Sequence, residues 1–91
     1  MKFEFDSTKS ASNRSKHGVD FQAAQALWLG PLVELRARDE TEQRMLVIGK
    51  IGRVYWSAIV VYRGESIRLI SVRRSREDEK AIHHQHFGDD G

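Results

Sequence analysis

The stretch VYWSAIVVYRGESIRLISVRR, residues 54–74, decides the fold, because it predicts two long strands joined by a short turn. From Val54 to Tyr62 the side chains alternate with a period of two, and both resulting faces are largely apolar. A strand of this kind belongs in the middle of a sheet, with helices covering at least one side. Arg63-Gly64-Glu65 suits a hairpin turn, so the second strand should run antiparallel to the first.

Two helices are expected in the N-terminal third of the chain. Asp6 or Ser7 can cap a first helix over residues 8–16, because a short side-chain oxygen accepts from free backbone N–H groups. Asp20 begins a second helix by the same logic, and Gly30-Pro31 ends it. The apolar stripe of the second helix has helical spacing and consists of Phe21, Ala24, Leu27 and Trp28.

The remaining elements complete an α+β pattern. Two further strands are predicted at residues 32–38 and 45–50, and a very short one near Phe3. Ser75, with Asp78 three residues on, can cap a last helix over residues 76–86. We therefore expect two N-terminal helices, a four-stranded antiparallel sheet and a C-terminal helix. Residues 1–87 form one domain in this prediction, and residues 88–91 form a disordered tail.

Composition narrows the class of protein. Ninety-one residues suffice for one compact domain. There are no cysteines, which excludes disulfides, thiol chemistry and cysteine-based zinc sites. Neither a signal peptide nor a membrane span is recognisable, so a cytoplasmic protein is expected. The net charge is only +2, but ten arginines stand against five lysines, and five of the arginines lie within residues 63–76. This asymmetry predicts a local basic face.

Arg68, Arg73 and Arg74 are the first candidate site residues. On a regular strand Arg68 and Arg74 share one face, and Arg73 points to the other. Ion pairs with Glu65 or Glu77 would explain them as surface residues. The functional alternative is phosphate contact, because the arginine fork can bind two oxygens of a phosphate at once.

Two shorter motifs are also candidates. Glu42 and Arg44 are two residues apart near the start of a strand and should face the same way. They form either a simple ion pair or a unit in which the carboxylate orients the guanidinium or acts as a base. Lys16-His17-Gly18 lies where the first helix ends, which suits basic residues and a glycine stop on structural grounds alone. Alternatively, Lys16 binds a phosphate and His17 transfers a proton.

The histidines of the last predicted helix can be read in two ways. His83 and His86 are one turn apart, as in some metal sites, but no third ligand is evident, so we expect neither a metal nor another cofactor. Glu79 stands four residues before His83 and could hold its ring. An imidazole held in this way is a candidate general acid or base near neutral pH.

The order and spacing of these motifs resemble the BrnT family, toxins of type II toxin–antitoxin pairs. The resemblance runs from about Phe3 to His83, nearly the whole chain. The matching positions are Phe5-Asp6, Lys9, Asn13, Lys16-His17-Gly18-Val19, Phe21, Ala24, Glu42-x-Arg44, Gly49, Ile67-Arg68-x-Ile70-Ser71-x-Arg73 and Glu79. Members commonly carry tryptophan where Phe5 stands and an aromatic hydroxyl residue near the position of His83.

The resemblance implies a fold similar to that of RelE-type ribonucleases, RNA cleavage and inhibition of translation. It also implies a BrnA-type ribbon-helix-helix antitoxin that covers the toxin in a hetero-oligomer. This complex would contact operator DNA only through the antitoxin. The residues carried over are Lys16, His17, Glu42, Arg44, Arg68, Arg73 and Arg74. We expect a metal-independent endoribonuclease with catalytic residues His17, Glu42, Arg44, Arg73, Arg74 and His83, and with Lys16 and Arg68 binding RNA. The alternative is an inactive relative that binds an antitoxin or nucleic acid without cleaving it.

Overall fold

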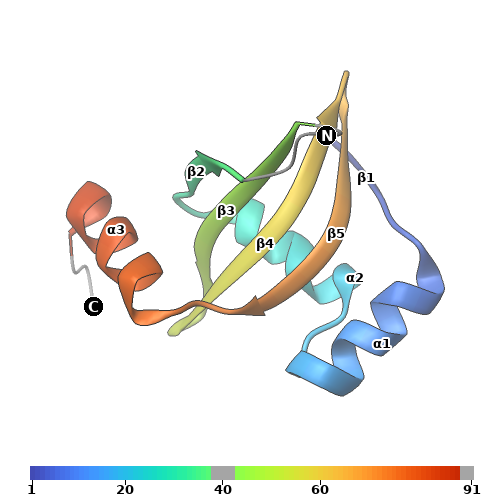
Figure 1. Ribbon diagram of the computed structural model, residues 1–91, viewed down its shortest axis with the longest axis horizontal. Coiled ribbons are helices and arrows are strands. Elements are labelled where there is room, and N and C mark those ends of the chain that lie inside the picture. The colour runs from blue at the N-terminus through green and yellow to red at the C-terminus, as the bar shows by residue number, and fades with distance from the viewer. Residues whose placement is uncertain (38–42, 89–91) are drawn as a thin grey trace.

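The computed structural model describes residues 1–37 and 43–88, which form three helices of α type, one 3-10 helix and a single sheet (Figure 1). The helices are α1 Ser7–His17, α2 Phe21–Ala24, η1 Gln25–Leu29 and α3 Glu77–Phe87. The strands are β1 Lys2–Glu4, β2 Val33–Arg36, β3 Arg44–Ile51, β4 Val54–Arg63 and β5 Ser66–Arg74. The α+β class is therefore as predicted. Residues 89–91 of the predicted tail lie outside the described part.

The sheet has five strands in the order β1-β5-β4-β3-β2. Strands β2 to β5 pair antiparallel with their neighbours in sequence, as predicted. Strand β1 pairs parallel with β5, so the prediction of four strands, all antiparallel, was wrong. Phe3 explains the addition, because it lies opposite Ile67 and its ring centroid is 5.2 Å from that of Trp28, in an edge-to-face contact.

Helix α1 begins and ends at the predicted signals. The carboxylate of Asp6 accepts hydrogen bonds from the N–H groups of Thr8 and Lys9, at 2.8 and 3.1 Å. Gly18 stops the helix with a left-handed φ of 87°, a conformation that glycine adopts without a steric penalty. These local interactions fix where the helix begins and where it ends.

The second predicted helix is only partly α-helical. Asp20 caps it by accepting from the N–H of Ala23 at 2.8 Å, as expected. After Ala24 the chain tightens into the 3-10 helix η1, so the single helix predicted up to Gly30-Pro31 was wrong in this detail. Phe21, Ala24 and Leu27 still point the same way and are buried.

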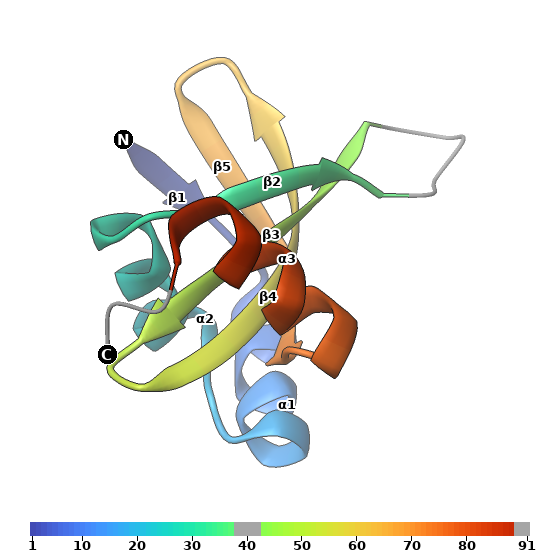
Figure 2. The ribbon, with the colours of Figure 1, turned by 90° about the vertical axis from the view of Figure 1, so that its left-hand side faces the viewer.

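Helices cover the two faces of the sheet unequally. On one side, Val47, Ala58, Val60 and Val72 pack with the buried residues of α2 and η1 to form the core. On the other side, α3 contacts β2 and β3 (Figure 2). We call this second side the open face; the residues on it include Arg44, Leu46, Ser57, Ile59, Val61, Arg68, Ser71 and Arg73.

The start of α3 differs from the prediction. Arg76, rather than Ser75, is the N-cap, and its N–H donates to the carboxylate of Glu79 at 2.8 Å. Ser75 is buried instead, with its hydroxyl 2.7 Å from that of Ser57. The residue that leads into α3 is therefore attached to β4 by a buried polar contact.

Among the described residues, no helix is both long and apolar enough to cross a membrane.

Candidate functional site

An irregularity in β5 determines which arginines share a face. Ser71 pairs with Ile59 and Leu69 pairs with Val60, so Ile70 between them has no partner on β4. This β-bulge shifts the alternation of the strand by one residue. Arg68 and Arg73 consequently both lie on the open face, opposite Val61 and Ser57.

Arg74 lies on the opposite side of the sheet from these two arginines. It pairs with Trp56, and its guanidinium carbon is 5.5 Å from the centroid of the Trp56 ring, a cation–π contact. The prediction that Arg68 and Arg74 share a face, with Arg73 on the other, was therefore wrong. The physical reason is the bulge, because a period of two was assumed through the whole strand.

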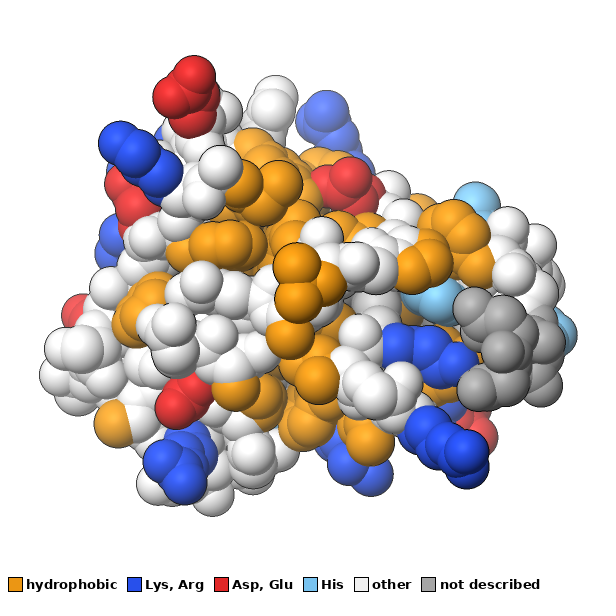
Figure 3. Space-filling model, turned by 180° about the vertical axis from the view of Figure 1, so that it is seen from behind, with side chains coloured by type: hydrophobic (Ala, Val, Ile, Leu, Met, Phe, Trp, Pro, Cys, Tyr) orange, Lys and Arg blue, Asp and Glu red, His pale blue; other side chains and the backbone are white. Residues whose placement is uncertain are grey.

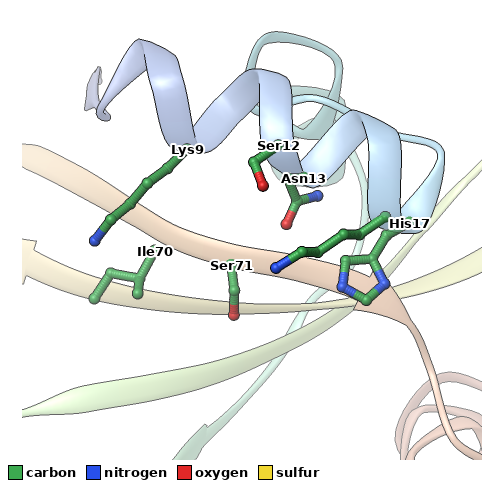
Figure 4. Close-up of a pocket in the computed structure, with 7 residues that line it drawn as sticks. Lys9, Ser12, Asn13, His17, Ile70 and Ser71 are labelled. Carbon is green, nitrogen blue, oxygen red and sulfur yellow. The ribbon is translucent and has the colours of Figure 1, made fainter.

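A groove of about 190 Å³ runs between α1 and the bulge of β5. Its lining residues are Lys9, Ser12, Asn13, Lys16, His17, Ile70 and Ser71. The helical residues 9, 12, 13 and 16 recur at the spacing that places side chains on one side of a helix. Figure 4 shows Lys9, Ser12 and His17 descending from the helix toward the strand that carries Ile70 and Ser71.

The groove is electropositive. Lys9, Lys16 and His17 contribute basic groups, Ser12 and Ser71 contribute hydroxyls, and no lining residue is acidic. The pKa of Asp6, just before α1, lies below its usual range because of hydrogen bonds from the N–H groups of Lys9 and Thr8, with the charges of Lys9 and Arg68 adding to the effect. Arg68 pairs with Glu4 of β1 in the sheet, and its positive charge acts on the Asp6 carboxylate at the start of α1.

Arg73 is held by a buried carboxylate. Its Nη1 and Nη2 donate to Oε1 and Oε2 of Glu79, both at 2.8 Å. Ser57 donates to Oε1 at 2.9 Å. The guanidinium of Arg73 holds the pKa of Glu79 at about 2, helped by the N–H of Arg76 and the hydroxyl of Ser57. In return, Glu79 raises the pKa of Arg73.

Glu79 was assigned a different role by the sequence, as a partner of His83 one helical turn away. Its hydrogen-bond partners are instead Arg73, Ser57 and the N–H of Arg76. No local spacing reveals this arrangement, because β5 and α3 approach each other only after the chain has turned at Ser75. Sequence reasoning also missed Lys9, Ser12 and Ser71, although the spacing of residues 9, 12 and 16 was a usable signal.

His83 is an interior residue. It is 4% exposed, its Nε2 lies 3.1 Å from the carbonyl oxygen of Pro31, and its ring packs edge-on against Tyr55 with centroids 5.3 Å apart. It therefore faces the loop before β2, away from the residues that line the groove. The structure does not bring His83 together with Lys16 and His17.

Arg44 and Glu42 can be placed only in part. Arg44 begins β3 and pairs with Val61, which on its other side pairs with Arg68. Arg44, Val61 and Arg68 thus form a row across the open face. Glu42 lies outside the described residues, so its predicted pairing with Arg44 stays a prediction.

The face seen from behind has a different character. Hydrophobic side chains form a band across the middle of the molecule, and lysines and arginines lie scattered around its margins (Figure 3). This face offers apolar contact instead of concentrated positive charge. Within residues 1–37 and 43–88, no group of three His, Asp or Glu side chains is arranged to hold a metal ion.

Comparison with known proteins adds one finding. A family model described as "Ribonuclease toxin, BrnT, of type II toxin-antitoxin system" matches residues 5–79, which include every lining residue of the groove. No curated protein matches the chain.

Proposed function

The chain belongs to the BrnT family of ribonuclease toxins of type II toxin–antitoxin systems, and from this premise we propose that it cleaves RNA at the groove between α1 and β5. The observation that carries the proposal is the concentration of Lys9, Lys16 and His17 around a groove whose lining contains no acid. A polyanion is attracted to such a surface irrespective of its sequence. A phosphodiester is the group that this chemistry fits best.

The proposed reaction needs no metal ion, because RNA supplies its own nucleophile. The 2′-hydroxyl attacks the adjacent phosphorus and the 5′-oxygen of the next nucleotide leaves, so the protein has to align these groups and move two protons. Lys16 and Arg68 hold the phosphates in this scheme, and His17 transfers a proton. Arg73 stabilises the negative charge that develops on the phosphorus oxygens.

The other predicted site residues take different places in the proposal. Arg44 supplies further positive charge from β3, on the far side of β4, and Glu42 orients it. Arg74 and His83 are left out, because Arg74 stacks on Trp56 across the sheet and His83 is buried against Pro31.

We also propose the partner and the cellular effect. A BrnA-type antitoxin with a ribbon-helix-helix DNA-binding part covers the toxin, and the hetero-oligomer contacts operator DNA through the antitoxin. Free toxin acts in the cytoplasm and lowers translation by destroying RNA. The fold proposed for this activity is of the RelE type.

Inducible expression with and without the neighbouring gene tests the proposal. Expression alone should stop growth and deplete RNA, and co-expression of the antitoxin should restore both. The double variant Lys16→Ala, His17→Ala should be harmless, whereas Lys80→Ala on α3 should remain toxic. A purified chain that binds its partner tightly yet leaves RNA intact would instead identify an inactive binding protein.

A further inference from the structure

We propose that the free edge of the Arg73 guanidinium binds two oxygens of an RNA phosphodiester, and that Glu79 is the residue that positions it. The inference rests on the proposed function for the identity of the ligand, but the geometry stands independently of cleavage. It assigns to Glu79 a role in substrate recognition that the sequence did not suggest.

The hydrogen bonds of Arg73 account for only part of its donors. A guanidinium has five N–H groups. Nη1 uses both of its own, toward Glu79 Oε1 at 2.8 Å and toward the carbonyl oxygen of Arg74 at 3.2 Å. Nη2 uses one, toward Glu79 Oε2 at 2.8 Å. Within residues 1–37 and 43–88, no group accepts from the N–H of Nε or from the second N–H of Nη2, and these two N–H groups lie side by side on one edge of the guanidinium.

These two remaining donors form a second fork. Parallel N–H groups on one edge of a guanidinium match two oxygens of a phosphate, which is the geometry of a bidentate arginine–phosphate pair. The Arg73 side chain is 28% exposed, whereas that of Glu79 is 7% exposed. Glu79 is therefore the buried member of the pair, and Arg73 is the member that solvent, and hence a ligand, can reach.

Glu79 is itself held from two further directions. The Ser57 hydroxyl on β4 and the N–H of Arg76 both donate to its Oε1, at 2.9 and 2.8 Å. A carboxylate fixed by a strand and by a helix start cannot rotate away without leaving buried donors unpaired. The guanidinium is therefore oriented before any ligand arrives, which lowers the entropic cost of binding.

The ion pair also changes what Arg73 recognises. Because Glu79 neutralises its charge locally, Arg73 should contribute little to long-range attraction and more to the geometry of the bound phosphate. Lys9 and Lys16, which have no acidic neighbour in the groove lining, would supply the attraction. The two kinds of basic residue then have separable effects on binding.

A purely structural ion pair is the alternative, in which Arg73 and Glu79 only attach α3 to the sheet. An NMR titration distinguishes the structural role from the phosphate-binding role. It follows the Arg73 Nε–H signal while an uncleavable 2′-deoxy oligonucleotide is added as probe in 0.3 M salt. In the wild-type protein the signal should shift on titration. Glu79→Gln should abolish the shift, weaken probe binding about tenfold, and lower kcat for RNA more than it raises KM.

Two further variants make the experiment decisive. Val33→Ala, on the strand that α3 contacts, should destabilise the protein comparably yet keep the Arg73 shift. If Glu79→Gln does not fold, Ser57→Ala leaves the ion pair in place but removes one of its supports, and should weaken probe binding about threefold.

This inference is overturned, even if RNA is cleaved, if the Arg73 Nε–H signal does not shift when the probe is added. It is also overturned if the Glu79→Gln or Ser57→Ala variant binds the probe as tightly as the wild type. A wild-type protein that shows the shift but cleaves no RNA would overturn the proposed function and leave the inference standing.

Discussion

The side chain of Asn13 takes the place of a neighbouring strand beside Val72. Its Oδ1 accepts from the Val72 N–H at 3.1 Å, and its Nδ2 donates to the Val72 carbonyl at 2.8 Å and to that of Val19 at 2.7 Å. Strand β1 pairs with β5 only as far as Arg68, so the edge of β5 would otherwise be uncovered there. One amide thus fixes α1, which is one wall of the groove, to the strand that forms its other wall.

Replacing Asn13 by alanine should lower the free energy of unfolding by about 2–4 kcal/mol, because buried main-chain groups lose their partners. Urea denaturation measures the change. Ser12→Ala, one residue earlier and exposed, is the matched control and should stay within about 0.5 kcal/mol of the wild type. Equal stability of the two variants would show that α1 is held in place by other contacts.

Arg73 and Arg74 are adjacent in sequence but should differ in activity. Arg73→Ala should lower kcat for RNA cleavage by about 100-fold or more, the usual effect of removing a group that stabilises transition-state charge. Arg74→Ala should change kcat by less than about threefold, since Arg74 stacks on Trp56 across the sheet. Single-turnover cleavage of a short RNA measures both. If Arg74→Ala loses more kcat than Arg73→Ala, the reaction takes place on the Trp56 side of the sheet and not on the open face.

The lysines of the groove should control the salt dependence of RNA binding. Each phosphate contact with a single strand makes the slope of log K against log salt more negative by about 0.7. The double variant Lys9→Ala, Lys16→Ala should therefore make the slope less negative by about 1.4 if each lysine makes one contact. Fluorescence anisotropy with an uncleavable oligonucleotide, from 0.05 to 0.3 M salt, gives the slope. Lys80→Ala, which pairs with Glu77 on α3, should leave it unchanged.

Acid should remove the stabilisation that comes from Glu79. Its pKa falls from an ordinary value of 4.5 to about 2 on folding, because Arg73 hydrogen-bonds the ionised form. A lowered carboxylate pKa gives stability that is fully present above pH 4.5 and is lost as the pH falls toward 2. Urea midpoints between pH 2 and 6 should drop more steeply for the wild type than for Glu79→Gln.

Glu77→Gln is the control for this pH dependence. Its side chain is 88% exposed and contacts Lys80 at 3.0 Å, the kind of surface pair that adds little stability. It should follow the wild-type curve. If Glu79→Gln follows that curve as well, the ion pair with Arg73 does not contribute to folding stability.

The structural features that depend only on adjacent residues were predicted correctly from the sequence. The caps at Asp6 and Asp20 and the stop at Gly18 need only a few adjacent residues, so their signals are local. The hairpin of β4 and β5 was equally clear from its alternation and turn. Strand β1 was recognised as a strand but not as part of the sheet, because three residues do not reveal a partner more than sixty positions away.

The site was predicted less completely, for one main reason. Leu69 and Ile70 are both apolar, so either could point into the core, and nothing in the sequence marks Ile70 as the residue that bulges out of register. The side of the sheet assigned to Arg73 and Arg74 depended on that choice. His83 gave no clear signal of burial either, because one of its ring contacts, Tyr55, comes from the distant strand β4, and the other, Phe87, is the last residue of α3.

The unpaired residue in β5 also limits how this strand can lengthen or shorten in related sequences. Insertion of one residue between Arg68 and Leu69 would turn the buried Ile67 outward and point Arg68 toward the core. Changes of two residues would preserve the inward and outward pattern on both sides of the bulge. Related sequences should therefore differ in the length of this strand by even steps.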